Sequence, residues 1–240
     1  RKGSSAASDV YKRQKLGYEC SPKHFKILAI WSQSLASLGL LTEKLHLIYE
    51  AQNKIEEVIE NPTDQPEILY SQGMYLTALG SYFKEPDYHY QAAEKFQEGL
   101  SIDRTNHKLW YAIAKANLSS ALLDQEERTF DNACKFFEFA LNLKTSSVYY
   151  YYYGLCLSRY GELLQDQDLT EKAVNQFKQA LAMQRNAPYL HPNWLFEYAC
   201  ALDHLGIFLE DDTYYTKALD ILNHVLMLNP EFPNLHYRLA

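Results

Sequence analysis

The side chains that could perform acid–base or metal chemistry are scattered along this sequence and do not form a recognisable motif. The 240 residues contain no glycine-rich phosphate loop, no G-x-S-x-G nucleophile turn and no H-E-x-x-H metal motif. The histidines are dispersed, and His89, His107, His191 and His204 lack the spacing of metal ligands. The sequence therefore favours a protein without a catalytic, cofactor or metal site.

Carboxylates and thiols, the other groups that could do chemistry, lie at positions where helix capping or packing explains them. Short acidic clusters recur at the turns between predicted helices, at 126–127, 166–168 and 210–212. Carboxylates at a helix start cap its N–H groups and interact favourably with its dipole, which favours capping over acid–base catalysis. Asp168 and Thr170 are the predicted N-cap residues of one such helix. The four cysteines form no C-x-x-C pair, and Cys156 and Cys200 adjoin small residues, which favours packing.

The elements that carry these residues form a repeated pair of amphipathic helices. In the second helix of each pair an alanine recurs at steps of 41, 41, 40 and 45 residues: Ala51, Ala92, Ala133, Ala173 and Ala218. A large apolar residue follows one helical turn later, on the same face. These residues are Ile55, Phe96, Phe137, Phe177 and Leu222. This register, kept over five copies, predicts a stack of one helix-pair unit.

The first helix of each pair keeps the same register through small residues. Nineteen positions before each alanine stand Ser32, Gly73, Ala114, Gly154 and Ala199. Seven positions further along stand Gly39, Gly80, Ala121, Gly161 and Gly206. Small side chains let two helices cross closely, so these positions predict a seam between the two helices of each pair.

This pattern resembles the tetratricopeptide repeat, whose signature runs W-x2-L-G-x2-Y, then A-x3-F, then P. The matching residues in this sequence are Tyr150, Tyr153, Gly154, Leu157, Ala173, Phe177 and the Asn229-Pro230 pair. The resemblance covers residues 23–240 and implies an all-α fold, a right-handed superhelical solenoid of antiparallel helix pairs. The sequence departs from the family in one respect: nineteen residues separate the small residue from the alanine, where the family has about twelve.

Seven extra residues correspond to about two helical turns, and they return to nearly the same helical face. We therefore expect a first helix that is longer than in the family, because apolar pairs such as Leu163-Leu164 follow the second small residue. The alternative interpretation makes the glycines at this second position helix C-caps, with the extra residues in a loop.

The ends of the chain differ from the repeats. Residues 1–22 are expected to be a non-native scar and a disordered lead-in, because Asp9–Gln14 (DVYKRQ) resembles a translated transposon end of the kind used in sequencing libraries. Five helix pairs are predicted at about 23–63, 64–105, 106–146, 147–191 and 192–232. Residues 233–240 begin a sixth pair, in which Ala240 takes the small position. Pro188 and Pro192 predict a bend in the connection between the fourth and fifth pairs.

An aromatic ring recurs three residues before the small position of the first helix: Tyr70, Tyr111, Tyr151, Phe196 and, in the partial copy, Tyr237. The resemblance implies that this position lines the concave groove of the solenoid, with Lys108, Lys115 and Arg159 on neighbouring positions. Rings beside positive charge suit a peptide or partner helix with apolar and acidic residues. Alternatively, the rings wedge between adjacent first helices and meet no ligand. The family's clamp for a C-terminal carboxylate uses Lys and Asn here, so that activity is not implied.

The composition narrows the class of partner. A net charge of −7 and a pI near 5.6 argue against a nucleic-acid ligand, and no apolar run is long enough to span a bilayer. The preferred hypothesis is a cytoplasmic, non-catalytic scaffold that binds a protein or peptide in the aromatic-lined groove. The alternatives are a secretion or assembly chaperone, or the docking or regulatory arm of a larger enzyme whose catalytic domain lies outside this sequence. An uncovered C-terminal edge is expected to permit self-association.

Overall fold

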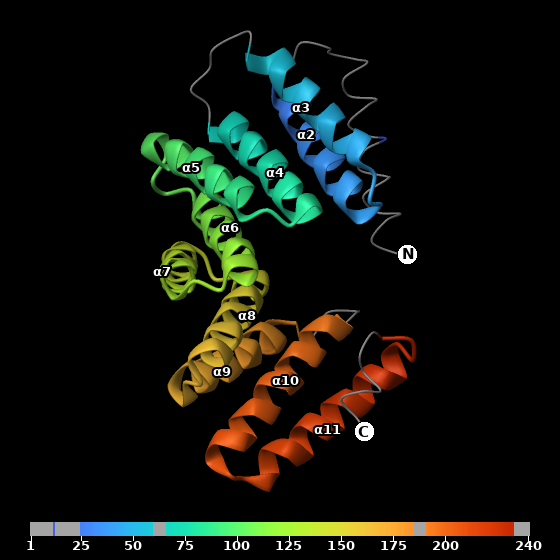
Figure 1. Cartoon of the computed structure of the whole chain (residues 1–240), viewed down its shortest axis with the longest axis vertical. Coiled ribbons are helices and arrows are strands. Elements are labelled where there is room, and N and C mark those ends of the chain that lie inside the picture. Colours follow the sequence, from blue (N-terminus) through green and yellow to red (C-terminus); the bar gives the residue numbers. More distant parts are fainter. Residues whose placement is uncertain (1–11, 13–24, 60–65, 185–190, 233–240) are drawn as a thin grey trace. The chain divides into compact units, whose positions relative to one another are not determined.

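The structure, a computed structural model, describes Lys12 and residues 25–59, 66–184 and 191–232. The described residues form α-helices joined by short connections and contain no strand (Figure 1). The helices are α2 (Phe25–Leu41), α3 (Leu45–Ile59), α4 (Pro66–Phe83), α5 (Pro86–Ile102), α6 (His107–Asp124), α7 (Glu127–Leu143), α8 (Ser147–Leu164), α9 (Gln167–Met183), α10 (Pro192–Leu209) and α11 (Asp212–Leu228). Three predicted segments lie outside the described residues: the scar and lead-in except Lys12, the part of the bend around Pro188, and the partial copy at 233–240.

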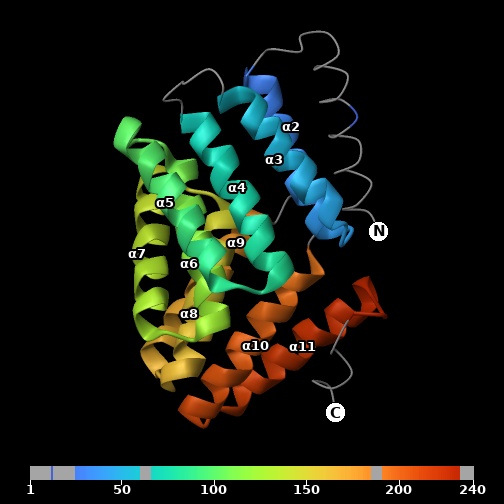
Figure 2. The ribbon, with the colours of Figure 1, turned by 45° about the horizontal axis from the view of Figure 1, so that its top comes forward.

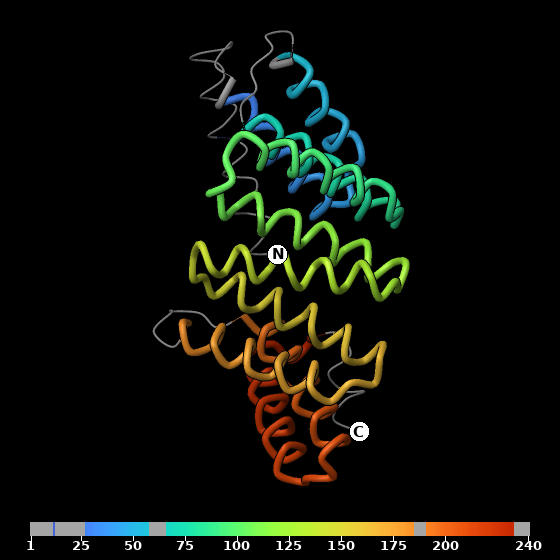
Figure 3. The backbone as a smooth tube through the Cα atoms, turned by 90° about the vertical axis from the view of Figure 1, so that its left-hand side faces the viewer, coloured from blue at the N-terminus to red at the C-terminus, as the bar shows by residue number. Residues whose placement is uncertain are grey.

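The chain divides into an N-terminal unit, residues 1–143, and a C-terminal unit, residues 144–240. In the N-terminal unit the pairs are α2–α3, α4–α5 and α6–α7, with further packing of α4 on α2 and α3 and of α6 on α5. In the C-terminal unit the pairs are α8–α9 and α10–α11, and α10 also packs on α9. Figure 2 shows α10 and α11 side by side, and the trace in Figure 3 turns back after each first helix.

The helices begin where the sequence supplies a cap or a proline. Pro66, Pro86 and Pro192 are the first residues of α4, α5 and α10, a position that tolerates the missing N–H. The N-cap of α9 is Asp166, whose carboxylate accepts a hydrogen bond from the Leu169 N–H at 3.0 Å. The expected caps Asp168 and Thr170 are therefore wrong, because both already lie inside the first turns of α9.

The first helices end in a uniform way that the sequence does not signal. A residue in the left-handed conformation follows directly after α4, α6, α8 and α10 and is the second residue after α2; φ lies between 51° and 58° at Glu43, Lys84, Gln125, Gln165 and Glu210. None of the described glycines has a positive φ. The helices run on for 17 or 18 residues, beyond the second small position. The structure thus has the longer first helix, and the glycines are not its C-caps.

The glycines and alanines instead mark where the two helices of a pair touch. The alanines of the second helices are 0–3% exposed, and Ala114 and Ala199 are 0% exposed. A Cβ built on Gly73 would lie 2.5 Å from Cζ of Phe96, and one on Gly154 would lie 3.0 Å from Cδ1 of Phe177. At Gly73 and Gly154 the small residue on the first helix thus leaves room for the large apolar residue of the second.

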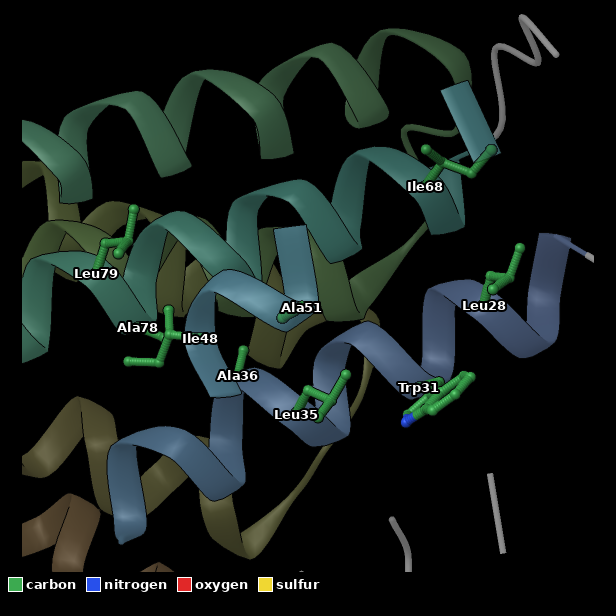
Figure 4. Packing of buried hydrophobic residues seen from close by; sticks show 9 residues of the cluster. All are labelled: Leu28, Trp31, Leu35, Ala36, Ile48, Ala51, Ile68, Ala78 and Leu79. Carbon is green, nitrogen blue, oxygen red and sulfur yellow. The ribbon is translucent and has the colours of Figure 1, made fainter. Parts of the chain in front are cut away.

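In the N-terminal unit this seam continues into a core shared by three helices (Figure 4). Its members are each at most 5% exposed: Leu28, Trp31, Leu35, Ala36, Ile48, Ala51, Ile68, Ala78 and Leu79. Because α4 contributes to the core of the preceding pair as well as to its own, the two pairs support each other. This mutual support is the physical basis of a stacked-repeat fold.

Candidate functional site

Two of the recurring aromatic rings of the first helices lie against the second helix of their own pair. The ring centroids of Tyr70 and Phe96 are 5.6 Å apart, and those of Tyr111 and Phe137 are 6.2 Å apart. Both tyrosines are half-buried. These rings therefore have a packing role and still present part of their surface to solvent.

Tyr151 occupies the same position in α8 but is enclosed, with 7% of its surface exposed. Its ring stacks on Trp194 of α10 at a centroid distance of 4.7 Å and an angle of 9°, and it also contacts Phe177. Burial, with a smaller contribution from Glu197, raises the pKa of the Tyr151 phenol. For this residue the structure has the wedged arrangement that the sequence left as an alternative, and little of the ring is available to a ligand.

The two remaining rings of the predicted groove lie near or beyond the end of the described chain. Phe196 in α10 is half-buried and its ring centroid lies 5.0 Å from that of Phe232. Tyr237 lies outside the described residues.

A hollow of about 550 Å³ opens where the N-terminal parts of α2, α4 and α6 meet. The helix positions can be followed in Figure 1, and the lining residues are Ala29, Ile30, Gln33, Pro66, Glu67, Tyr70, Asn106, His107, Lys108 and Leu109. Ile30 is 44% exposed and offers apolar surface in this wall. This hollow, which we call the first-helix hollow, lies on the predicted groove face of the N-terminal unit.

A partly buried hydrogen-bond chain links two walls of the first-helix hollow. Gln33 Nε2 of α2 donates to Ser71 Oγ of α4 at 2.7 Å, and Ser71 Oγ donates to the Glu67 carbonyl at 2.8 Å. Ser71 is 1% exposed, so this link is shielded from water. The third wall starts at Asn106, whose side chain accepts from the Lys108 N–H and fixes the start of α6.

The first-helix hollow carries a carboxylate, Glu67, in its second wall and a cation, Lys108, in its third. Lys108 is exposed at the rim, and Lys115 is half-buried two turns further along α6. Burial raises the pKa of Tyr70, so its phenol stays neutral at physiological pH and serves as a hydrogen-bond donor or acceptor. The hollow thus combines an apolar wall with a neutral polar group, one carboxylate and one cation.

Arg159, the third cation expected in the groove, is instead neutralised. Its Nη1 and Nη2 lie 2.7 Å from Glu162 and from Glu197, so the guanidinium joins α8 to α10. Burial alone would lower the pKa of Arg159, but the two carboxylates outweigh it and raise that pKa. His204 Nδ1 also lies 3.2 Å from Glu162. The expectation that Arg159 offers positive charge to a ligand is therefore not supported by its surroundings.

Several residues of these sites carried no signal in the sequence. Ile30 stands beside the recurring ring position, and Glu67 stands three residues before Tyr70, but neither belongs to a repeated pattern. Glu197 and Trp194 become partners of Arg159 and Tyr151 only because α10 packs beside α8. Sequence separations of 38 and 43 residues give no local signal for such contacts.

The described residues also bear on metal binding and membrane insertion, which the sequence did not favour. Within the described ranges, no group of three or more His, Cys, Asp or Glu side chains is arranged to hold a metal ion. None of the helices described by the structure is long and apolar enough to cross a membrane.

Comparison with known proteins gives the fold a name. No family model and no curated protein matches the sequence. Solved structures do match, with a TM-score of 0.61 to "PilW, widely conserved type IV pilus biogenesis factor", at 15% identity and 100% coverage of both chains. TTC0263, "a thermophilic TPR protein" of Thermus thermophilus, matches at TM-score 0.57 and 18% identity, over 87% of this chain and 97% of that one. The chain has the tetratricopeptide-repeat fold.

Other proteins of tetratricopeptide-repeat fold match over most of their length. YrrB, described as "a TPR protein with an unusual peptide-binding site", has a TM-score of 0.53 and 14% identity, over 93% of this chain and 96% of that one. Structural matches at identities this low show the fold alone. The ligand of this tetratricopeptide-repeat chain has to be inferred from its own surface. The resemblance read from the small and apolar columns is thereby confirmed at the level of fold.

Proposed function

We propose that this chain is a non-catalytic interaction protein that binds a peptide or a partner helix on the face formed by its first helices. The observation that carries the proposal is the first-helix hollow, about 550 Å³ in volume, to which three first helices contribute. A concave, largely apolar surface with a few fixed polar groups is typical of binding sites.

The side chains of the hollow indicate the chemistry of its ligand. Ile30, Tyr70 and Leu109 suit an apolar anchor residue, and Lys108 at the rim suits an acidic residue beside that anchor. The net charge of −7 for the whole chain disfavours a nucleic acid as partner. The finer parts of the hypothesis, a cytoplasmic location and self-association, stay predictions.

The test uses two isoleucines with similar exposure. Ile30, in the wall of the hollow, is 44% exposed, and Ile102, the last residue of α5 and outside the hollow, is 47% exposed. Peptides are selected from a random library on the unmodified chain, and the affinity of the best one is measured by fluorescence anisotropy for Ile30→Asp and Ile102→Asp. We expect binding to weaken at least tenfold in Ile30→Asp and to stay unchanged in Ile102→Asp.

The charge is tested separately through Lys108→Glu. We expect the selected peptide to contain an acidic residue, and the variant to bind it more weakly and with less dependence on salt, because an exposed ion pair is screened by salt. Thermal unfolding of all variants checks that the fold is intact. Equal affinity for Ile30→Asp and Ile102→Asp, or no saturable peptide, would contradict the proposal.

A further inference from the structure

A second surface, separate from the first-helix hollow, lies between the second helices α5 and α7 of the N-terminal unit. It is a groove of about 460 Å³, and it shares no lining residue with the first-helix hollow. Helix α6 packs against both α5 and α7 and contributes to the floor; the three helices can be followed in Figure 1. We call this surface the α5–α7 groove, and its lining residues are Gln97, Leu100, Ser101, Arg104, Trp110, Ile113 and Phe136.

Helix α7 departs from the repeat at this groove. Three and six positions after the recurring alanine, each of the other second helices carries at least one polar side chain: Lys54 and Glu57, Lys95 and Glu98, Gln176 and Gln179, and Ile221 and His224. The first two of these pairs are ion pairs. In α7 both positions are phenylalanine, Phe136 and Phe139, and Phe139 is 50% exposed. Because the helix pairs form with polar residues at these positions, packing within a pair does not require the two rings, and an exposed aromatic surface of this kind indicates a binding site.

The two rings of α7 form a cluster with Trp110 of α6. The centroid of the Trp110 ring lies 6.0 Å from that of Phe136 and 4.9 Å from that of Phe139, at angles of 31° and 32°. The indole N–H of Trp110 donates to the Arg104 carbonyl at 2.9 Å, so the indole has no polar hydrogen left for a ligand. The cluster therefore offers apolar ring faces to whatever binds there.

The polar groups of the α5–α7 groove that are open to a ligand are hydrogen-bond donors. The Ser101 hydroxyl already donates to the Glu98 carbonyl at 2.6 Å, which leaves the guanidinium of Arg104 and the exposed side-chain amide of Gln97. Arg104 is the one charged residue among those that line the groove. The carboxylate of the neighbouring Asp103 accepts hydrogen bonds from the Thr105 N–H and hydroxyl. The groove thus favours a ligand with carbonyl oxygens and an acidic residue.

We infer that the α5–α7 groove binds a proline-rich segment of a partner protein, in the polyproline II conformation, with an acidic residue next to the prolines. Proline-rich segments dock in aromatic-lined grooves, and their conformation is already formed before binding. Proline has no backbone N–H, so a run of prolines presents carbonyl acceptors, which match the donors Arg104 and Gln97. The chain itself contains no two consecutive prolines, so a run of this kind comes from another protein.

The probe is a fluorescein-labelled synthetic peptide, a run of prolines followed by two aspartates, and its binding to the whole 240-residue chain is measured by anisotropy. We expect saturable binding that falls at least tenfold in the double variant Phe136→Gln with Phe139→Gln, which introduces the pair found in α9. The matched control is Phe83→Gln in α4, where the phenylalanine is 42% exposed and lies outside the groove; it should bind as the unmodified chain does. Thermal unfolding checks that each variant is folded.

The charge is tested through Arg104→Gln, which keeps the backbone carbonyl that accepts from Trp110. We expect binding of the probe to weaken about two- to fivefold, as for the loss of an exposed ion pair. A probe of prolines alone should bind the variant and the unmodified chain more nearly alike, and an unchanged affinity of the aspartate-bearing probe would contradict the proposed acidic residue.

A mirror-image probe built from D-amino acids separates a specific fit from adhesion to exposed rings, because it has the same composition and charge but the opposite helical sense. It should bind at least tenfold more weakly, and equal binding of the two probes overturns the proposal. No saturable binding, or equal loss in the double variant and Phe83→Gln, also refutes it. If the chain is dimeric by analytical ultracentrifugation and the double variant makes it monomeric, a second copy occupies the groove and the proposal is likewise overturned. Ile30→Asp should leave binding unchanged, since a loss there would place the probe in the first-helix hollow instead.

Discussion

Replacing Gly73 with alanine tests the helix seam at its tightest point. The added Cβ would lie 2.5 Å from Cζ of Phe96, and Phe96 is only 1% exposed, so its ring has little room to move. Overpacking a core costs about 1–3 kcal/mol. Exchanging glycine for alanine inside a helix gains about 1 kcal/mol. The two effects oppose each other, and we expect a net loss in the free energy of unfolding of about 1 kcal/mol.

The measurement is urea unfolding followed by circular dichroism, together with amide exchange in α4 and α5. Exchange is needed because repeat proteins do not always unfold in one step. A double-mutant cycle with Phe96→Leu isolates the clash, because a smaller side chain at position 96 removes its cause. We expect Gly73→Ala to cost less when Phe96→Leu is present than when it is absent.

Gly154 provides a graded control for the same seam. Here the added Cβ would lie 3.0 Å from Cδ1 of Phe177, so a small shift of the ring relieves the contact. We expect Gly154→Ala to leave stability within about 0.5 kcal/mol of the original, and Gly154→Leu to cost about 1–3 kcal/mol. An increase of about 1 kcal/mol in Gly73→Ala would show that the glycine is not at a close crossing and would refute the seam.

Three further predictions concern single residues. Gln125 has φ 56°, a conformation that glycine adopts without strain. Gln125→Gly should therefore raise the free energy of unfolding by about 0.5 kcal/mol in urea titrations. An unchanged or lower free energy of unfolding would contradict this prediction. Burial lowers the pKa of His89 from 6.5 to about 4, so between these pH values the folded state binds fewer protons than the unfolded state. The free energy of unfolding should therefore fall as the pH drops from about 7 to 4, by at most about 1.4 kcal/mol per pH unit. His89→Phe should remove that part of the pH dependence of the melting temperature, and an unchanged profile would show that His89 is not its source. Tyr151→Ala should cost about 3 kcal/mol, because it empties the space between Trp194 and Phe177, and a loss below about 1 kcal/mol would mean that the ring is not enclosed.

The repeat could be read from the sequence because its cause is local. A helix places every third or fourth residue on one face, so Ala173 and Phe177 had to share a face once the segment was helical. The small partner on the first helix, Gly154, was recognisable because nineteen residues separate it from Ala173, as in every copy. Spacing of this kind requires no knowledge of how separate pairs meet.

The binding face was only partly predictable, because the exposure of a side chain on a first helix depends on which side chains the next helix pair places over it. Tyr70 and Tyr151 stand at the same repeat position, yet Tyr70 borders the first-helix hollow and Tyr151 lies under Trp194. Arg159 was expected beside the ring positions as a positive charge of the groove, but Glu162 and Glu197 compensate its charge. A position within a repeat therefore predicts the direction of a side chain better than its accessibility or its net charge.

The order of small and large apolar residues alone was enough to establish helix pairs, their register and the contact between Gly73 or Gly154 and the following aromatic ring. The left-handed residues after the first helices, the first-helix hollow and the pairing of Arg159 emerged only from the folded chain. The reason is physical: helix periodicity and packing within a pair act over one or two turns and one short connection. Burial, ion pairing and cavity shape arise where segments about 40 residues apart meet, and their free energies depend on neighbours that no local pattern specifies.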